Sequence, residues 1–165
     1  MLSPGEFLRR VPDAVRPQLP PALSSFRSAT RFSLAQLWYG NKLLHYEVWL
    51  RARERRLELG LHFEADPLTN ARLLAAFRTH ERAVHRALGD EALIEQWDKG
   101  WARIWEPVAL PTLDAPFLAV IARRIAGYMT ALEPMLRDEL PAGVAWSERR
   151  APQRAATAVR AKQRR

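Results

Sequence analysis

The chain has 165 residues, of which 48% are hydrophobic, and it contains no cysteine. This length and hydrophobic content suit one globular domain, and the missing thiols exclude disulfides, thiolate nucleophiles and cysteine-based zinc or iron–sulfur sites. No apolar run approaches the roughly 20 residues that span a bilayer, and charged residues and prolines interrupt the N-terminus where a secretory signal needs an apolar core; we therefore expect a soluble, cytoplasmic protein.

The net charge of +8 is divided unevenly along the chain. Residues 1–31 carry +3, residues 141–165 carry +6, and residues 32–140 together carry −1. This division predicts a basic N-terminal arm, a near-neutral domain over 32–140 and a basic C-terminal tail. Arginine is far commoner than lysine, a bias typical of a GC-rich genome, so we expect a bacterial source.

The C-terminal tail has the composition of a disordered segment, with spaced arginines among alanine, glutamine and threonine. Two interpretations fit it: a solvated terminus, or an arm that contacts nucleic acid nonspecifically. In the second interpretation the contacting residues are Arg149, Arg150, Arg154, Arg160, Arg164 and Arg165.

The N-terminal segment is rich in proline, at positions 4, 12, 17, 20 and 21. Proline inside a helix removes a backbone hydrogen bond and clashes with the preceding turn. We therefore expect residues 1–31 to form an extended arm rather than a helix.

Three strands are predicted next, over 34–39, 43–51 and 56–64. Gly40 and Asn41 suit a tight hairpin turn between the first two strands, and Arg53 and Glu54 are expected to turn the chain again. Hydrophobic residues alternate with polar ones along the strands, which is the period of a half-buried sheet. The predicted core face consists of Leu37, Leu44, Tyr46, Val48, Leu50, Leu57, Leu59, Leu61 and Phe63.

Two helices and a fourth strand follow. Asp66 and Pro67 predict a helix that ends at Gly89, residues 94–107 predict a strand broken by a bulge near Gly100, and Asp114 predicts the start of a last helix. The expected fold is α+β: an antiparallel three-stranded meander plus a fourth strand, with two main helices packed on one sheet face and extended basic arms at both ends.

The polar face of the meander carries a candidate metal site. With two-residue turns, His45 pairs with Gln36 on one side and with His62 on the other, and Glu47, Glu58 and Glu64 lie nearby. Cross-strand neighbours are close enough for two imidazoles and a carboxylate to share one divalent ion. The alternative is a solvated outer sheet face, to which Gln36, Trp49 and Glu58 belong. We name His45, His62 and Glu64 as candidate ligands and Glu47 as a candidate catalytic carboxylate.

Glu81 is a second candidate catalytic carboxylate. In a continuous helix from Pro67 it falls among Leu74, Phe77 and Val84, on the stripe that faces the core. A buried carboxylate needs a partner or a raised pKa, so the position fits either a structural ion pair or an acid/base group.

The predicted fourth strand alternates aromatic and basic side chains. Trp97, Trp101 and Trp105 are separated by Lys99 and Arg103. Such interleaving can stack bases and hold phosphates, or it can pack arginine stems over tryptophan rings. The adjacent acidic residues favour packing, because they make the strand a poor phosphate track.

The order of elements over 32–107 resembles part of the layout of restriction-endonuclease-like nuclease domains, which hold metal with acidic residues on adjacent strands. Their motif ends with an acidic residue, one spacer and a lysine on the third strand. The segments here read Glu58-Leu59-Gly60 and Glu64-Ala65-Asp66, without that lysine. The resemblance is therefore one of layout and supplies no catalytic residues.

No complete catalytic, cofactor or nucleic-acid signature is present. The leading expectation is a noncatalytic α+β domain that binds a partner, either a protein or a second copy of itself, with basic arms that contact nucleic acid. The alternative is a metal-dependent hydrolase or nuclease that uses the His/Glu cluster, and a divalent ion is the one cofactor that the sequence suggests.

Overall fold

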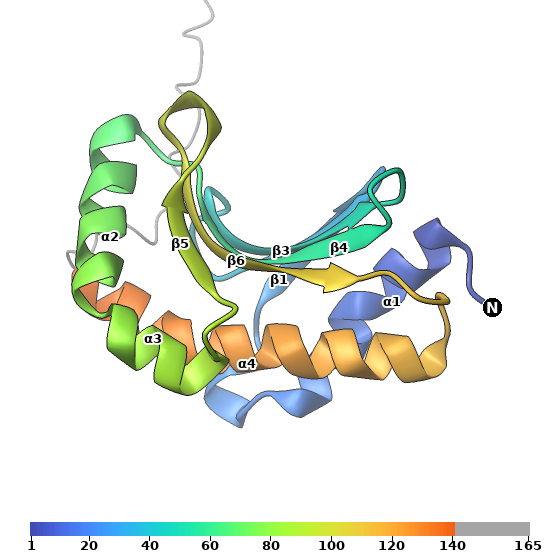
Figure 1. The fold of residues 1–165 in the computed structure, drawn as a ribbon. Coiled ribbons are helices and arrows are strands. Elements are labelled where there is room, and N and C mark those ends of the chain that lie inside the picture. The colour runs from blue at the N-terminus through green and yellow to red at the C-terminus, as the bar shows by residue number, and fades with distance from the viewer. Residues whose placement is uncertain (141–165) are drawn as a thin grey trace, which may run out of the picture.

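The computed structural model describes residues 1–140 (Figure 1). Four α-helices and a six-stranded sheet make up the fold, with three short 3-10 turns between them. In chain order the elements are α1 (Pro4–Val15), η1 (Arg16–Gln18), η2 (Pro21–Leu23), β1 (Arg27–Arg31), β2 (Leu34–Trp38), β3 (Leu44–Arg51), β4 (Arg56–Phe63), α2 (Pro67–Thr79), α3 (Glu81–Leu88), β5 (Leu93–Gln96), η3 (Asp98–Gly100), β6 (Ala102–Ala109) and α4 (Ala115–Glu139).

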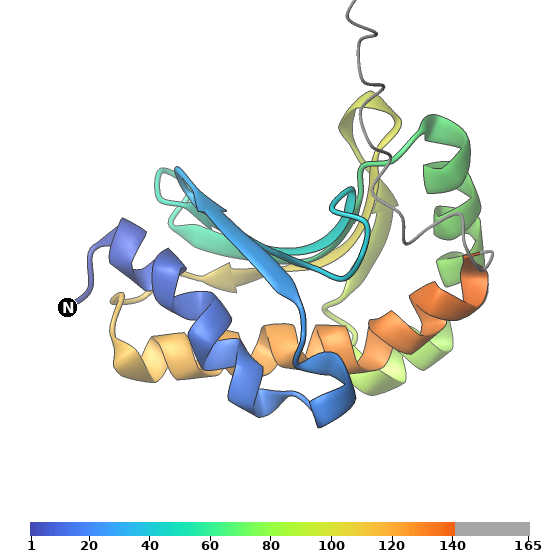
Figure 2. The same ribbon diagram turned by 180° about the vertical axis from the view of Figure 1, so that it is seen from behind.

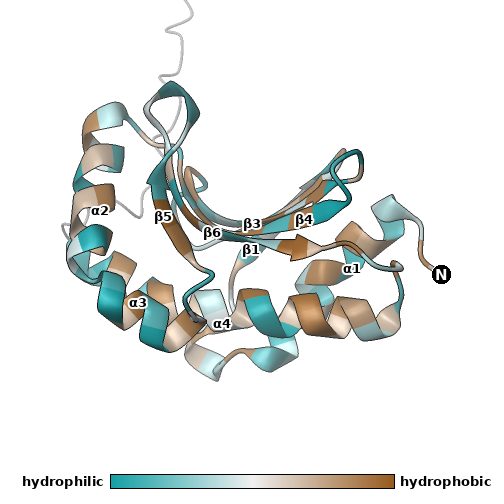
Figure 3. Ribbon diagram, in the orientation of Figure 1, coloured by the Kyte–Doolittle hydropathy of each residue, from teal (hydrophilic) through white to brown (hydrophobic). Residues whose placement is uncertain are grey.

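The sheet is antiparallel throughout, and its strand order is β1-β2-β3-β4-β6-β5. It is strongly curved, with α1 and α4 below its convex face, and Figure 2 shows the same arrangement from behind. Helices α1 and α4 pack against each other and on the sheet, and Figure 3 shows hydrophobic residues along both. The predicted α+β class and the predicted core face of the meander are confirmed, since all nine residues of that face are buried.

The N-terminal segment is not an extended arm. Residues 4–15 form α1, which begins after the N-cap Ser3 with Pro4 in its first turn, where no helical N–H is needed. Pro12 lies inside the helix, and the burial of Phe7, Leu8 and neighbouring apolar residues against α4 offsets the hydrogen bond that it removes. Residues 27–31 then add β1 to the sheet edge.

The predicted helix from Pro67 to Gly89 is two helices. The chain breaks at His80, whose φ of −99° and ψ of 14° are not helical, and α3 starts in a new direction at Glu81. The predicted fourth strand is likewise two strands, β5 and β6, because Lys99 and Gly100 both have positive φ and reverse the chain.

Within the described residues, no helix has both the length and the apolar character needed to cross a membrane. Helix α4 is long enough, at 25 residues, but it carries charged side chains along its length. Pro134 lies inside this single helix.

Candidate metal centre on the concave face

The face opposite the helices, here the concave face, is polar and aromatic. Because side chains alternate along a strand, the pairing of the strands brings one set together there. Its members include Gln36 and Trp38 from β2, His45, Glu47 and Trp49 from β3, Arg56, Glu58, Gly60 and His62 from β4, and Arg103 and Trp105 from β6.

The sequence-based expectation that this face is a solvated surface is wrong for its central residues. His45, Glu47 and His62 are 2%, 4% and 3% exposed, and Glu58 is buried as well. Curvature brings the side chains of neighbouring strands together, and the ring of Trp97 lies edge-on at 5.4 Å from the ring of His62. These polar groups therefore lie in a protected site.

The predicted pairing of His45 with His62 is confirmed, and their rings stack with centroids 5.6 Å apart. Gln36 pairs with Glu47 instead of His45, because the β2–β3 loop spans residues 39–43 and is longer than a two-residue turn. The register therefore moves by two residues, which keeps every side chain on its predicted face.

Four side chains converge into a group that we call the His–Glu cluster: His45, Glu47, His62 and Glu64. One potential ligand atom from each lies within 4.8 Å of all the others. The Nε2 atom of His45 is 3.2 Å from Glu47 Oε2 and 4.0 Å from Glu64 Oε1, and His62 Nδ1 is 3.6 Å from the same Glu64 oxygen. The cluster thus brings together the three candidate ligands, His45, His62 and Glu64, and the candidate catalytic carboxylate Glu47.

The orientation of His45 is fixed from outside the cluster. Its Nδ1 lies 2.9 Å from the carbonyl oxygen of Lys42, which can only accept, so Nδ1 carries a proton and donates to this oxygen. The Nε2 atom then points into the cluster, 3.1 Å from the Gln36 amide nitrogen and 3.2 Å from Glu47 Oε2, and the same amide donates to Glu47 at 3.0 Å. Metal-binding histidines are commonly held by such a backbone carbonyl.

Three buried side-chain nitrogens have no hydrogen-bond partner among the described residues, and all three belong to the concave face. They are His62 Nδ1, Trp38 Nε1 and Arg56 Nε. An unpaired buried polar atom costs roughly 1–3 kcal/mol. Trp38 Nε1 and Arg56 Nε can only donate a hydrogen bond, whereas an imidazole nitrogen such as His62 Nδ1 can also coordinate a cation when it is unprotonated.

Glu47 carries the negative charge that suits a residue that binds a metal ion. Burial raises the pKa of this carboxyl, but the hydrogen bond from His45, the charge of His62 and the hydrogen bond from Gln36 outweigh burial and lower the pKa to about 2. Glu47 is therefore ionised at neutral pH and offers a carboxylate oxygen to a cation.

In the tryptophan-rich segment 97–105, Arg103 packs on tryptophan rings, as the packing interpretation predicts. Arg103 lies 4.8 Å from the ring centroid of Trp97 and 3.8 Å from that of Trp105, and it is ion-paired with Glu58 and Glu95. Its charge is thus already compensated, and Arg103 forms one wall of the concave face.

Gly60 lies beside the His–Glu cluster, at a point where the backbone of β6 approaches β4 too closely for a side chain. A Cβ atom at Gly60 would lie 2.1 Å from the carbonyl oxygen of Ile104 and 2.6 Å from Trp105 Cα. Close approach of another backbone, one of the two reasons for a mid-strand glycine, accounts for this residue.

Glu81 is not part of the site. Its position on the core-facing stripe requires a continuous helix, and the break at His80 places it in the exposed first turn of α3. The prediction of Glu81 as a buried carboxylate is therefore wrong.

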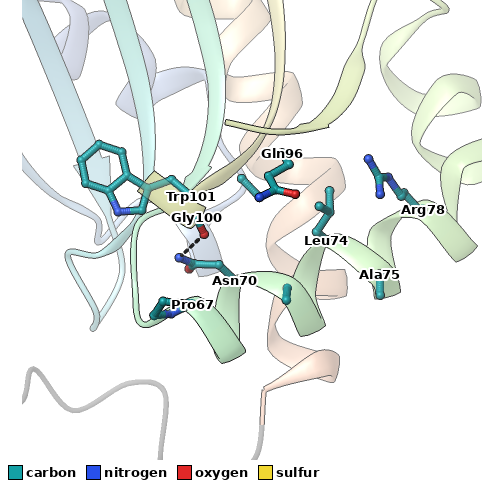
Figure 4. Close-up of a pocket in the computed structure, with 10 residues that line it drawn as sticks. Pro67, Asn70, Leu74, Ala75, Arg78, Gln96, Gly100 and Trp101 are labelled. Carbon is teal, nitrogen blue, oxygen red and sulfur yellow. Dashed lines mark hydrogen bonds between the residues drawn. The ribbon is translucent and has the colours of Figure 1, made fainter. Parts of the chain in front are cut away.

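A separate pocket of about 320 Å³ lies between α2 and the β5–β6 hairpin (Figure 4). Asn70, which is buried, donates to the carbonyl oxygen of Gly100 across it, and Trp101 stands at its edge. Six of the ten lining residues come from α2, and no member of the His–Glu cluster lines this pocket.

Comparison with models of protein families, with curated proteins and with solved structures finds no match for this chain. The six arginines predicted to contact nucleic acid lie in 141–165, outside the described residues. Sequence patterns did not reveal that the Lys42 carbonyl and Trp38 belong to the site. The conformation of the β2–β3 loop places the Lys42 carbonyl against His45, and the register of β2 on β3 pairs Trp38 with His45.

Proposed function

We propose that this protein binds one divalent transition-metal ion at His45, Glu47, His62 and Glu64. The observation that carries the proposal is the convergence of two imidazole nitrogens and two carboxylates within 4.8 Å, with His62 Nδ1 buried there and without a hydrogen-bond partner. Two histidines and two carboxylates form a donor set that suits Zn²⁺ and its first-row neighbours better than Mg²⁺.

The exposure of the ligands supports a reactive site rather than a closed structural one. Three members of the cluster are almost fully buried, whereas the Glu64 side chain is 20% exposed. Catalytic zinc sites bind the metal through three protein ligands and keep a fourth position for water or substrate. A reactive site here would therefore use His45, His62 and Glu64 as ligands and keep Glu47 as the catalytic carboxylate, and a metal ion lowers the pKa of its bound water toward neutrality. A metal-dependent hydrolase is the enzyme class that this arrangement supports best.

The test is calorimetric titration of chelator-treated, full-length protein with Zn²⁺, Mn²⁺ and Mg²⁺. We expect one Zn²⁺ per chain and weaker binding of Mg²⁺. His62→Ala should lower Zn²⁺ affinity by more than the roughly 10- to 100-fold that a lost second-shell contact costs. Glu64→Gln should weaken binding too, and because Glu64 is partly exposed this variant should fold normally.

His80→Ala provides the matched control. His80 is an exposed histidine outside the cluster, 3.7 Å from Glu139, so its removal should leave Zn²⁺ affinity unchanged. Absence of stoichiometric binding by the wild-type chain would overturn the proposal, as would equal binding by the folded Glu64→Gln variant. Turnover of bis(p-nitrophenyl) phosphate by the Zn²⁺-loaded chain then tests the hydrolase class separately.

A further inference from the structure

One end of the sheet presents an exposed aromatic residue among arginines. We call this surface the basic tip; it consists of residues 31–33, around the β1–β2 turn, and residues 51–56, around the β3–β4 turn. Ser33 O accepts a hydrogen bond from Leu50 N, so the two turns are neighbours, and Figures 1 and 2 both show them at the same end of the sheet. The tip carries five arginines and one glutamate.

Phe32 projects from this tip under backbone strain. It is 98% exposed and has a φ of 46°, in a two-residue turn where asparagine or glycine is the usual choice. Its neighbour Ser33 is fixed by the hydrogen bond that its Oγ accepts from Trp49 Nε1. A bulky apolar side chain held in water in a strained conformation contributes nothing to the core, and this combination points to a contact outside the chain.

The arginines of the tip divide into paired and unpaired groups. Arg51 is paired with Glu54, and Arg56 with Glu58. By contrast, Arg31, Arg53 and Arg55 are exposed and form no ion pair with any described residue. Three uncompensated guanidinium groups and one exposed aromatic ring therefore belong to the same tip.

We infer that the basic tip binds single-stranded nucleic acid, with Phe32 stacking on a base and Arg31, Arg53 and Arg55 contacting phosphates. Base stacking on an aromatic ring together with backbone charge is how sequence-tolerant single-strand binding surfaces work. A guanidinium group can donate two parallel hydrogen bonds to the oxygens of one phosphate. A single strand fits better than a duplex because only unpaired bases offer their faces to Phe32.

A membrane surface fits these observations less well. The tip presents one apolar side chain, whereas stable attachment to a bilayer takes two signals, such as a long acyl chain together with a basic patch. The flat ring of Phe32 and the planar guanidinium groups match bases and phosphates directly.

The test is fluorescence anisotropy of a labelled 12-nucleotide oligothymidylate with the full-length protein in EDTA, titrated over salt. A triple variant, Arg31→Gln with Arg53→Gln and Arg55→Gln, should bind at least about tenfold more weakly. Losing three phosphate contacts from a single strand should also reduce the slope of log K against log salt by about 2. Because the metal is chelated and the basic tip contains no member of the His–Glu cluster, this result does not depend on the metal proposal.

A second triple variant, Arg72→Gln with Arg82→Gln and Arg86→Gln, removes the same charge from exposed positions on α2 and α3. It should keep the wild-type salt slope apart from a small general effect of net charge. Equal losses in the two triple variants would show that net charge alone governs binding, and the inference would be wrong.

Phe32→Asn separates recognition from folding. Asparagine tolerates a positive φ, so this variant should be at least as stable as the wild type, while it binds the oligothymidylate about fivefold or more weakly because stacking is lost. Unchanged single-strand affinity in the folded Phe32→Asn variant would overturn the inference. So would Phe32-dependent binding to vesicles of phosphatidylserine and phosphatidylcholine without any effect on the oligonucleotide.

Discussion

The two faces of the sheet both bury polar groups, yet they satisfy them differently. On the convex face, Glu133 accepts hydrogen bonds from Tyr46 and Arg137, and Glu106 is paired with Arg124. On the concave face, by contrast, three buried nitrogens lack a hydrogen-bond partner among the described residues. The charged groups of the convex face thus have partners within the chain, whereas the concave face keeps three buried nitrogens without a hydrogen bond among the described residues.

This difference separates stability from function. Closed ion-pair and hydrogen-bond networks next to α4 hold the helices on the sheet without a ligand. The His–Glu cluster instead brings Glu47 and Glu64 close to two imidazoles in a protected site, an arrangement that a bound cation would satisfy. We therefore expect substitutions on the convex face to act on folding alone, and those on the concave face to act on folding and metal affinity together.

The largest effect should come from Gly60→Ala, which breaks the sheet that separates the two faces. The added methyl group would lie 2.1 Å from the carbonyl oxygen of Ile104. Because the contact is with backbone, β4 and β6 would have to separate, and we expect a loss of at least about 4 kcal/mol in the free energy of unfolding. Urea denaturation followed by tryptophan fluorescence measures this loss.

Gly127→Ala is the control for that substitution. A Cβ atom at Gly127 meets nothing within 4 Å, and the residue lies inside α4, so alanine should stabilise the protein by about 1 kcal/mol. A Gly60→Ala variant as stable as the wild type would show that the strands approach less closely than described here.

The next largest effect is expected from Glu47→Gln in chelator-treated protein. The pKa of Glu47 is lowered from 4.5 to about 2, so this carboxylate contributes stability that is present above pH 4.5 and is lost as pH falls toward 2. Glutamine should therefore cost about 3 kcal/mol at neutral pH and progressively less below pH 4.5. Urea denaturation between pH 2.5 and 7 measures this dependence, and a cost independent of pH would assign the effect to shape rather than to charge.

Local sequence patterns were sufficient to predict which residues of β3 and β4 lie on each face of the sheet. Alternation along β3 and β4 predicted the two faces, and the spacing of residues around Arg53 and Glu54 gave the pairing of His45 with His62. The pairing of β2 could not be obtained in the same way, because the length of its loop to β3 depends on backbone conformation at residues 39–43. The predicted register of β2 on β3 was wrong by two residues, and because this number is even, each side chain still lies on its predicted face.

The features that sequence patterns missed depend on distant contacts. Burial of the concave face arises from sheet curvature and from Trp97, which comes from a different part of the chain. Helix α1 tolerates Pro12 only because it packs on α4. The exposed position of Glu81 follows from two dihedral angles at His80, which the apolar period of the segment does not reveal.

The smallest expected effect sharpens the comparison most, because it reverses the pH dependence. Burial raises the pKa of Glu133, although hydrogen bonds from Tyr46 and Arg137 oppose this. Its contribution to stability is therefore full below pH 4.5 and is lost as pH rises through its pKa in the folded protein. Wild-type stability relative to Glu133→Gln should fall with rising pH, whereas stability relative to Glu47→Gln should rise.

Glutamine at position 133 keeps an oxygen that can accept from Tyr46, and Arg137, whose side chain is 43% exposed, can turn to water. At pH 4 the Glu133→Gln variant should therefore lie within about 1 kcal/mol of the wild type, and between pH 4 and 8 it should gain stability relative to it. Urea denaturation of both proteins across this range measures the difference. If the two variants instead showed parallel pH slopes, the carboxylates of the two faces would experience the same environment, and the contrast between a self-sufficient convex face and an unsatisfied concave face would fail.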